Sequence, residues 1–153
     1  MTAVARLEAQ QLHPDRELAR FTQEAAGAGA IVSFIGLARP QSKTREEVTS
    51  LFLDHYPGMT ERSLQEIADA GLARFDVSRI LVVHRCGGIA PEEPIVFVAA
   101  ASLHRRAAFH AADYLMDRLK TEAMFWKKEH GLDGGRWIEP SDQDRADLAR
   151  WSR

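Results

Sequence analysis

A chain of 153 residues that is 45% hydrophobic fits one compact domain with a real core, and it holds no apolar window long enough to cross a bilayer. Its formal net charge of -2 argues against a nucleic-acid coat, because affinity for a phosphate backbone comes from accumulated Lys and Arg. One cysteine, Cys86, excludes an internal disulfide framework and is a poor start for a structural zinc site.

We expect a single domain over residues 1–153. Residues 1–11 lack the basic start and long apolar run of a secretory signal, which favours a cytoplasmic protein without a membrane anchor. The lone thiol of Cys86 is predicted to be a small, buried strand residue.

The first elements are a helix and a strand followed by a polar loop. Apolar residues at helical spacing predict a helix over 15–26, and the apolar run 30–37 beside glycines predicts a strand. The stretch 40–48 is mostly polar and charged and has no aromatic residue, so a mobile loop is expected just after Arg39.

A strand, turn and helix come next, and then a pair of strands. Residues 49–56 predict a strand, and after a Pro-Gly turn Thr60 is expected to cap a helix. The β-branched runs 79–85 and 95–101 predict two further strands that pair antiparallel across a connection rich in glycine and proline.

The remaining sequence predicts the longest helix and a hairpin. Apolar residues repeat at helical spacing from 102 to about 121 with no Gly or Pro between them. Short strands are expected over 125–128 and 136–139, and a terminal helix over 142–151. Because this order mixes hairpins with crossovers, the expected class is α+β.

Basic residues gather on and around the longest helix. Ser102, His104 and Arg105 stand where a strand hands over to that helix, and a helix start favours anions through its unpaired N–H groups. An ordinary Ser102 cap with solvated charges is an equally good interpretation of this spacing alone.

Two lysines mark the other end of the same helix. Lys120 and Lys127 bracket the apolar run Met124-Phe-Trp126, where a partly desolvated lysine could have a lowered pKa and take part in proton transfer. A helix-ending lysine followed by a strand of core aromatics explains the same pattern.

The helix separates the two basic groups. Arg105 and Lys120 lie about 15 residues apart, or roughly 22 Å at 1.5 Å per residue. One small ligand cannot touch both ends. Either two ligands are bound, or His104 and Arg105 of one subunit meet Lys120 and Lys127 of another across a symmetric dimer, and we favour the dimer.

Several segments, taken in order, resemble the large, catalytic subunit of molybdopterin synthase, the MoaE family. They are Leu53-Asp-His-Tyr-Pro-Gly-Met-Thr60, Val83-His-Arg85, Ser102-Leu-His-Arg105, Tyr114-Leu-Met-Asp-Arg-Leu-Lys120 and Phe125-Trp-Lys-Lys-Glu129. As a set they are highly specific, and the resemblance is strongest over residues 30–151. It outweighs the structural interpretations of the basic residues given above.

The resemblance implies a fold of the α/β hammerhead type with a mixed or antiparallel sheet and packed helices. It implies a sulfurtransferase that takes sulfur from the C-terminal Gly-Gly thiocarboxylate of a small ubiquitin-like subunit. The acceptor would be cyclic pyranopterin monophosphate, which becomes the molybdopterin dithiolene in molybdenum cofactor biosynthesis. The implied assembly is a heterotetramer with a homodimeric core of large subunits and one small subunit at each end.

The resemblance also assigns roles to individual side chains. Lys120 and Lys127 surround the incoming tail as the catalytic pair. Substrate binding falls to Arg39, His104 and Arg105, which take the pterin phosphate, and to Phe34 and Met116, which shape the pocket. A thiocarboxylate carries its own nucleophilic sulfur, so neither a catalytic cysteine nor a cofactor or metal is expected.

The sequence departs from the family pattern at Cys86-Gly-Gly88 and at Pro91-Glu-Glu-Pro94, where a bulkier residue and a Gly-Asp turn are usual. Two rival functions remain open beside the enzyme. One is a docking protein that binds the ubiquitin-like subunit without turnover, and retention of Lys120 and Lys127 weighs against it. The other is a phosphate-binding regulator that uses the Ser102 helix start, although the chain has no G-x-x-x-x-G-K-[ST] loop.

Overall fold

Two four-stranded sheets frame the chain in the computed structural model, which describes residues 1–42, 44–132 and 134–152. The first sheet has the order β1-β4-β6-β2 and consists of β1 (Thr2–Glu8), β4 (Arg79–Arg85), β6 (Pro94–Ser102) and β2 (Ala30–Leu37). The second has the order β5-β3-β7-β8 and consists of β5 (Gly87–Ile89), β3 (Val48–His55), β7 (Phe125–Gly131) and β8 (Gly134–Ile138). Only the β1–β4 pair is parallel among the described strands, so the α+β expectation is confirmed.

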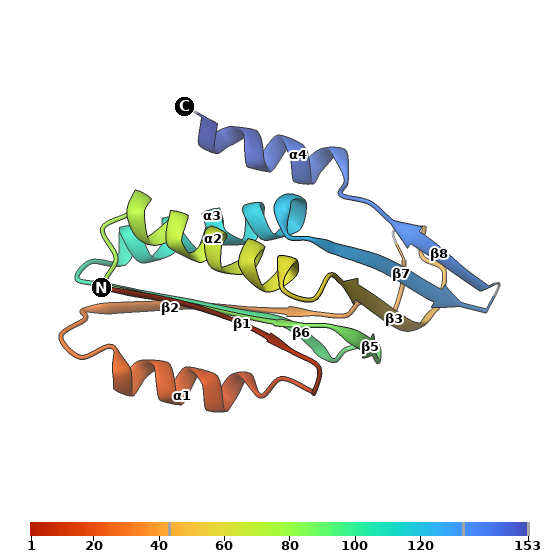
Figure 1. Cartoon of the computed structure of the whole chain (residues 1–153), viewed down its shortest axis with the longest axis horizontal. Coiled ribbons are helices and arrows are strands. Elements are labelled where there is room, and N and C mark those ends of the chain that lie inside the picture. The colour runs from red at the N-terminus through yellow and green to blue at the C-terminus, as the bar shows by residue number, and fades with distance from the viewer. Residues whose placement is uncertain (43, 133, 153) are drawn as a thin grey trace.

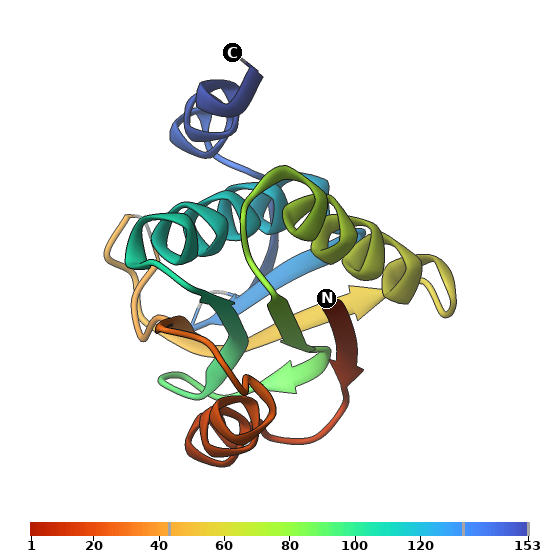
Figure 2. The ribbon, with the colours of Figure 1, turned by 90° about the vertical axis from the view of Figure 1, so that its left-hand side faces the viewer.

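Helices cover both faces of the first sheet. The helical elements are α1 (Pro14–Glu24), α2 (Met59–Arg74), α3 (Arg105–Glu122), α4 (Asp142–Ala149) and the short turn η1 (Arg150–Ser152). Helix α1 lies on one face, α2 and α3 lie side by side on the other, and α4 is outermost, beyond α3 (Figures 1 and 2). No helix in the described part of the chain is long and apolar enough to span a membrane.

The central strands read as unbroken apolar runs because they are buried on both faces. Along β4, Ile80 and Val82 pack with α2 and α3, while Leu81 and Val83 pack on the side of α1. Successive side chains of a strand point to opposite faces, so burial on both sides removes the usual alternation of apolar and polar residues. The predicted antiparallel pairing of 79–85 with 95–101 is confirmed, with Val82 opposite Val98.

A smaller apolar cluster joins the two sheets. Leu51 and Leu53 of β3 pack with Ala38 and Ile89, and Phe125 of β7 packs against them. The strands β3, β7 and β8 therefore lie beside the end of the first sheet at which β2 stops, near Leu37 (Figure 1). This junction brings the end of α3 next to the end of β4.

The predicted cap at Thr60 is wrong, and so is the interpretation of Ser102 as a cap. Helix α2 begins after Gly58, whose φ of 84° suits glycine and whose N–H donates to the Glu61 carboxylate at 2.8 Å. The buried Thr60 hydroxyl instead accepts from Tyr56 N–H and donates to the Met124 carbonyl at 2.7 Å. Thr60 thus fixes the connection between α3 and β7 that carries the lysine segment.

Ser102 also caps no helix, because it is the last residue of β6 and is 2% exposed. Its hydroxyl donates to the Asp76 carbonyl at 2.8 Å and accepts from His104 N–H at 3.3 Å. The N-cap of α3 is His104, in an extended conformation and without a side-chain cap bond. The helix therefore starts three residues later than the pattern of apolar residues predicts.

Strand β1 has no counterpart among the sequence-based predictions. It pairs parallel with β4 at the edge of the first sheet, Ala3 opposite Ile80. Its charged residues form ion pairs: Arg6 pairs with Glu8 of the same strand and with Glu17 of α1. A strand that mixes small, apolar and charged residues gives only a weak sequence signal. Its partner strand also lies far away in the sequence, so no local pattern points to the pairing.

The loop expected over 40–48 connects β2 and β3, although Val48 already belongs to β3. Gln41 and Glu47 form an isolated bridge, and Val48 N–H donates to the Pro40 carbonyl at 2.9 Å. Lys43 lies outside the described residues. Mobility of this loop stays a prediction.

The unusual connection after β4 is held by an ion pair between the buried Arg85 and the partly buried Glu93. Arg85 and Glu93 pair at 2.9 Å, and Arg85 also donates to the carbonyls of Ala9, Cys86 and Gly88. Cys86 is 5% exposed, so its predicted burial is confirmed, and burial raises its pKa. It lies between β4 and β5 rather than within a strand, which corrects that part of the prediction. The departures from the family pattern therefore form an ordered turn with short strand β5.

Candidate active site

A cavity of about 420 Å³ lies where the two sheets meet the end of α3. Five of the seven side chains expected at the site line it, namely Phe34, Arg39, Met116, Lys120 and Lys127. The chain from Ile138 to Asp144, which leads from β8 into α4, lines it as well. Sequence-distant residues are thus brought together by the junction of the sheets.

Each cationic side chain reaches the cavity from a different element. Lys120 is in the last turn of α3, one turn beyond Met116, so both lie on the same side of the helix. Lys127 is the third residue of β7 and stands between Leu53 of β3 and Ile138 of β8. Arg39 lies two residues after the end of β2.

The ammonium of Lys127 is poorly solvated. Its pKa is lowered from 10.5 to about 8, mainly by burial and also by the positive charges of Lys120 and Arg39. The carboxylates of Asp144 and Glu129 act in the opposite direction. A lysine with a pKa near neutrality exchanges protons readily, which the sequence-based hypothesis of a desolvated lysine required.

His84 also lines the cavity and was given no role from the sequence. Burial, together with Lys127 and Lys120, lowers the pKa of its imidazole from 6.5 to about 4, so the ring is neutral at physiological pH. The run Val83-His-Arg85 was a signal, but a histidine within a β-branched strand is usually a core residue. Only the fold shows that β4 ends at the cavity.

The segment 138–144 was also missed as a cavity wall. Ser141 caps α4 by accepting from Asp144 N–H at 3.0 Å, and the Asp144 carboxylate accepts from Ser141 N–H at 2.9 Å. The sequence predicted a terminal helix here, but its placement depends on distant contacts. Trp151 lies just beyond α4 and packs edge-on against Phe75 and Tyr114. These contacts anchor the far end of α4 to α2 and α3.

His104 and Arg105 do not line this cavity, because they lie at the opposite end of α3. Both are exposed. About 15 residues of helix separate Arg105 from Lys120, or roughly 22 Å. One chain therefore carries the expected site in two separate parts, with Arg39 on the side of the lysines.

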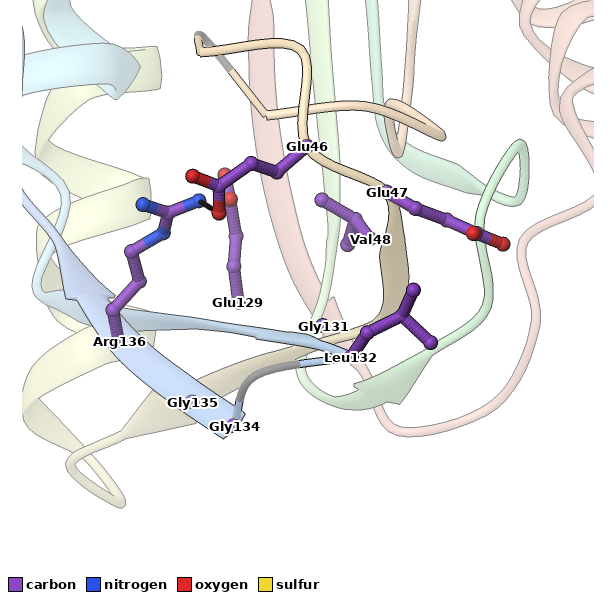
Figure 3. A pocket seen from close by; sticks show the side chains of 9 residues that line it. All are labelled: Glu46, Glu47, Val48, Glu129, Gly131, Leu132, Gly134, Gly135 and Arg136. Atoms are coloured by element: carbon purple, nitrogen blue, oxygen red, sulfur yellow. Dashed lines mark hydrogen bonds and ion pairs between the residues drawn. The ribbon is translucent and has the colours of Figure 1, made fainter.

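Two other hollows differ in character. A small one of about 60 Å³ adjoins the main cavity and shares Arg39, Lys120 and Lys127 with it. A hollow of about 360 Å³ lies at the tip of the β7–β8 hairpin (Figure 3). Among its described lining residues the one cation, Arg136, is paired with Glu46 at 2.8 Å, so this hollow offers an anion little attraction.

No group of three or more metal-ligating side chains occurs among the described residues. The described lining of the main cavity contains no cysteine either, and Cys86 is elsewhere. The ionisable groups in the described lining are the cations Arg39, Lys120 and Lys127, the imidazole of His84, and the carboxyl groups of Glu139 and Asp144.

Together, the fold and the site define a two-sheet α+β protein with a cavity lined by Arg39, Lys120 and Lys127. The family model described as MoaE protein matches residues 7–122. The chain belongs to the MoaE family.

The similarity extends over whole proteins. The molybdopterin synthase catalytic subunit of Caulobacter vibrioides is 46% identical over 98% of both chains. The solved structure of the molybdopterin biosynthesis MoaE protein from Burkholderia ambifaria is 38% identical, with a TM-score of 0.83 over 99% of both chains. A complex of subunits 1 and 2 of molybdopterin-converting factor from Helicobacter pylori contains a chain of the same fold, with 17% identity and a TM-score of 0.72 over 92% of both chains.

Proposed function

We propose that this chain is the catalytic subunit of a molybdopterin synthase. It transfers sulfur from the C-terminal thiocarboxylate of a small ubiquitin-like subunit to cyclic pyranopterin monophosphate and so forms the dithiolene of molybdopterin. The observation that carries the proposal is the cavity in which Lys120 faces the desolvated Lys127. Family membership and the likeness to a catalytic subunit along 98% of the chain support it.

The residue types suit sulfur transfer from a thiocarboxylate. The sulfur of the tail is itself the nucleophile, so the protein supplies charge and protons rather than a covalent carrier. Lys120 stabilises the negative charge of the tail, Arg39 takes part in binding the pterin phosphate, and Lys127, with a pKa of about 8, moves the proton. A docking protein without turnover would need no desolvated lysine.

Reconstitution tests the function directly. The purified chain, the thiocarboxylated small subunit and the pterin precursor should yield molybdopterin, detected as its fluorescent oxidation product. Lys120→Ala and Lys127→Ala should each lower the rate on the order of 100-fold or more. The matched control is Lys128→Ala, because Lys128 follows Lys127 but lies on the other face of β7, over the Trp137 ring. Absence of product beside an active control enzyme would contradict the proposal.

We further propose that the active site is shared across a dimer of this chain. The start of α3 is exposed and combines cations with apolar side chains, since Leu103 is 65% and Phe109 is 55% exposed. No described acidic side chain forms an ion pair with Arg105. In a symmetric dimer this surface would bring His104 and Arg105 to the partner's lysine cavity, where they would bind the pterin phosphate.

A mixed dimer distinguishes sharing from two independent sites. One protomer carries Lys120→Ala and the other carries Arg105→Ala. If the sites are composite, one site loses both groups and the other keeps both, so about half of the wild-type activity should return. If each chain holds a whole site, both protomers are defective and no activity returns, which would rule out sharing.

A further inference from the structure

The end of β4 carries a buried imidazole whose position is fixed on two sides. The His84 ring stacks on Phe125 with a centroid separation of 4.2 Å and an interplanar angle of 23°. Its Nδ1 lies 2.8 Å from the Arg85 carbonyl oxygen. The residue is 9% exposed, and its exposed part lies at the wall of the lysine cavity.

These contacts select one tautomer of the ring. A carbonyl oxygen only accepts hydrogen bonds, so Nδ1 must carry the proton and donate it. In the neutral ring Nε2 then has a free lone pair and is an acceptor. Because Nδ1 is tied to the backbone, Nε2 is the polar atom that the ring can offer to the cavity.

Lys127 is the cation best placed to meet this acceptor. Phe125 and Lys127 lie on the same face of β7, about 6.6 Å apart along the strand, and His84 stacks on the first of them. The lysine side chain is long enough to cover that distance. The ammonium and the imidazole also share the cavity and act on each other electrostatically.

We propose that His84 is a positioning residue of the active site: its Nε2 accepts a hydrogen bond from the Lys127 ammonium and holds that group toward the reacting sulfur. A neutral acceptor orients the ammonium without cancelling its charge, whereas a carboxylate would form an ion pair and weaken the attraction for an anionic tail. This role rests on the proposed sulfur transfer.

Two substitutions separate positioning from packing. His84→Phe keeps a ring that can stack on Phe125 but removes both nitrogens. His84→Gln loses the ring but keeps an amide oxygen that can accept near the position of Nε2. Packing alone therefore ranks Phe above Gln in stability and in activity, whereas positioning ranks Gln above Phe in kcat.

In the reconstituted synthase we expect kcat of His84→Phe to fall on the order of 100-fold, with the KM for the small subunit changed less than 3-fold, a loss typical of a misplaced catalytic group. His84→Gln should keep at least 10-fold more activity than His84→Phe, although it unfolds at a lower urea concentration. The matched controls are the same two substitutions at His110, an exposed histidine of α3 outside the cavity. A kcat of His84→Phe equal to or above that of His84→Gln would overturn the proposal.

A second readout needs no substrate. A hydrogen bond to the charged form of a group raises its pKa, so loss of the acceptor should lower the Lys127 pKa. Lysine labelled at Cε reports that titration by NMR, while the other charges that face Lys127 stay in place; these are Lys120, Arg39, Asp144 and Glu129. We expect the Lys127 midpoint to fall in His84→Phe. In His84→Gln, which keeps a neutral acceptor, it should stay within about 0.3 pH units of the wild-type midpoint.

The two readouts keep the two claims apart. If wild-type protein makes no molybdopterin but the Lys127 midpoint falls in His84→Phe, the proposed function fails and the hydrogen bond stands. If wild-type protein is active and neither the midpoint nor kcat distinguishes the two variants, the function stands and the role of His84 is refuted.

Discussion

Replacing Lys127 by methionine should make the protein more stable and inactive. A folded-state pKa of about 8 in place of 10.5 corresponds to an unfavourable contribution of about 3 kcal/mol to folding at neutral pH. Methionine has a similar length and carries no charge, and Leu53 and Ile138 offer it apolar neighbours. We therefore expect Lys127→Met to raise the free energy of unfolding by up to about 3 kcal/mol at pH 7.

The gain should depend on pH in a defined direction. Below pH 8 lysine is protonated in both the folded and the unfolded wild-type chain, so the full cost of burial is present. Between pH 8 and 10.5 the folded chain has released the proton while the unfolded chain still binds it, so wild-type stability rises with pH. Above pH 10.5 the cost is gone, and the difference between wild type and variant should shrink to its packing part.

Urea unfolding of wild type and Lys127→Met at pH 7 and at pH 10.5, at one protein concentration, measures both quantities. Lys128→Met is the matched control, since it removes a lysine from the opposite face of the same strand and should change stability by less than about 1 kcal/mol. A Lys127→Met protein that is less stable than wild type at pH 7, or a difference that does not shrink with pH, would refute the reasoning.

Two further changes test the packing that holds the site. Gly29→Ala should lower the free energy of unfolding by about 2–4 kcal/mol, because the new Cβ would lie 2.3 Å from the Leu103 carbonyl oxygen. The control is Gly88→Ala, whose Cβ would meet nothing within 4 Å. Its free energy of unfolding should stay within about 0.5 kcal/mol of wild type in the same urea titration. Arg85→Met should cost about 2–4 kcal/mol, because it leaves the partly buried Glu93 carboxylate without its cation. Adding Glu93→Gln should recover part of the loss. A double variant as unstable as the single one would count against an isolated charge as the cause.

Much of the fold could be predicted from the sequence because its signals are local. The apolar runs of β4 and β6, the long helix α3 and the glycine-rich β7–β8 turn are each visible within a few residues. Strand β1 was missed because its only strong partner, β4, is more than 70 residues away. Thr60 was expected to be a cap, and a cap was one of two interpretations of Ser102, because their residue types favour caps; both hydroxyls instead bond to distant backbone groups.

The site was predicted only as far as side-chain chemistry and family resemblance allow. Lys120, Lys127 and Arg39 do meet in one cavity, but neither periodicity nor composition shows that β4 ends there, so His84 was left without a role. The wall formed by residues 138–144 depends on how Trp151 packs on α2 and α3. Such placement is a property of the tertiary structure rather than of any segment.

The buried charge that destabilises the chain also favours the binding of its ligand. A carboxylate or thiocarboxylate beside Lys127 would counter the repulsion from Lys120 and Arg39, so its binding must raise the Lys127 pKa and, by linkage, must weaken as pH rises above about 8. His104 and Arg105 are roughly 22 Å away along α3 and add nothing to this attraction within one chain. The two cationic groups act on one substrate only if a second α3 supplies the missing end, and dimerisation then becomes a condition for catalysis.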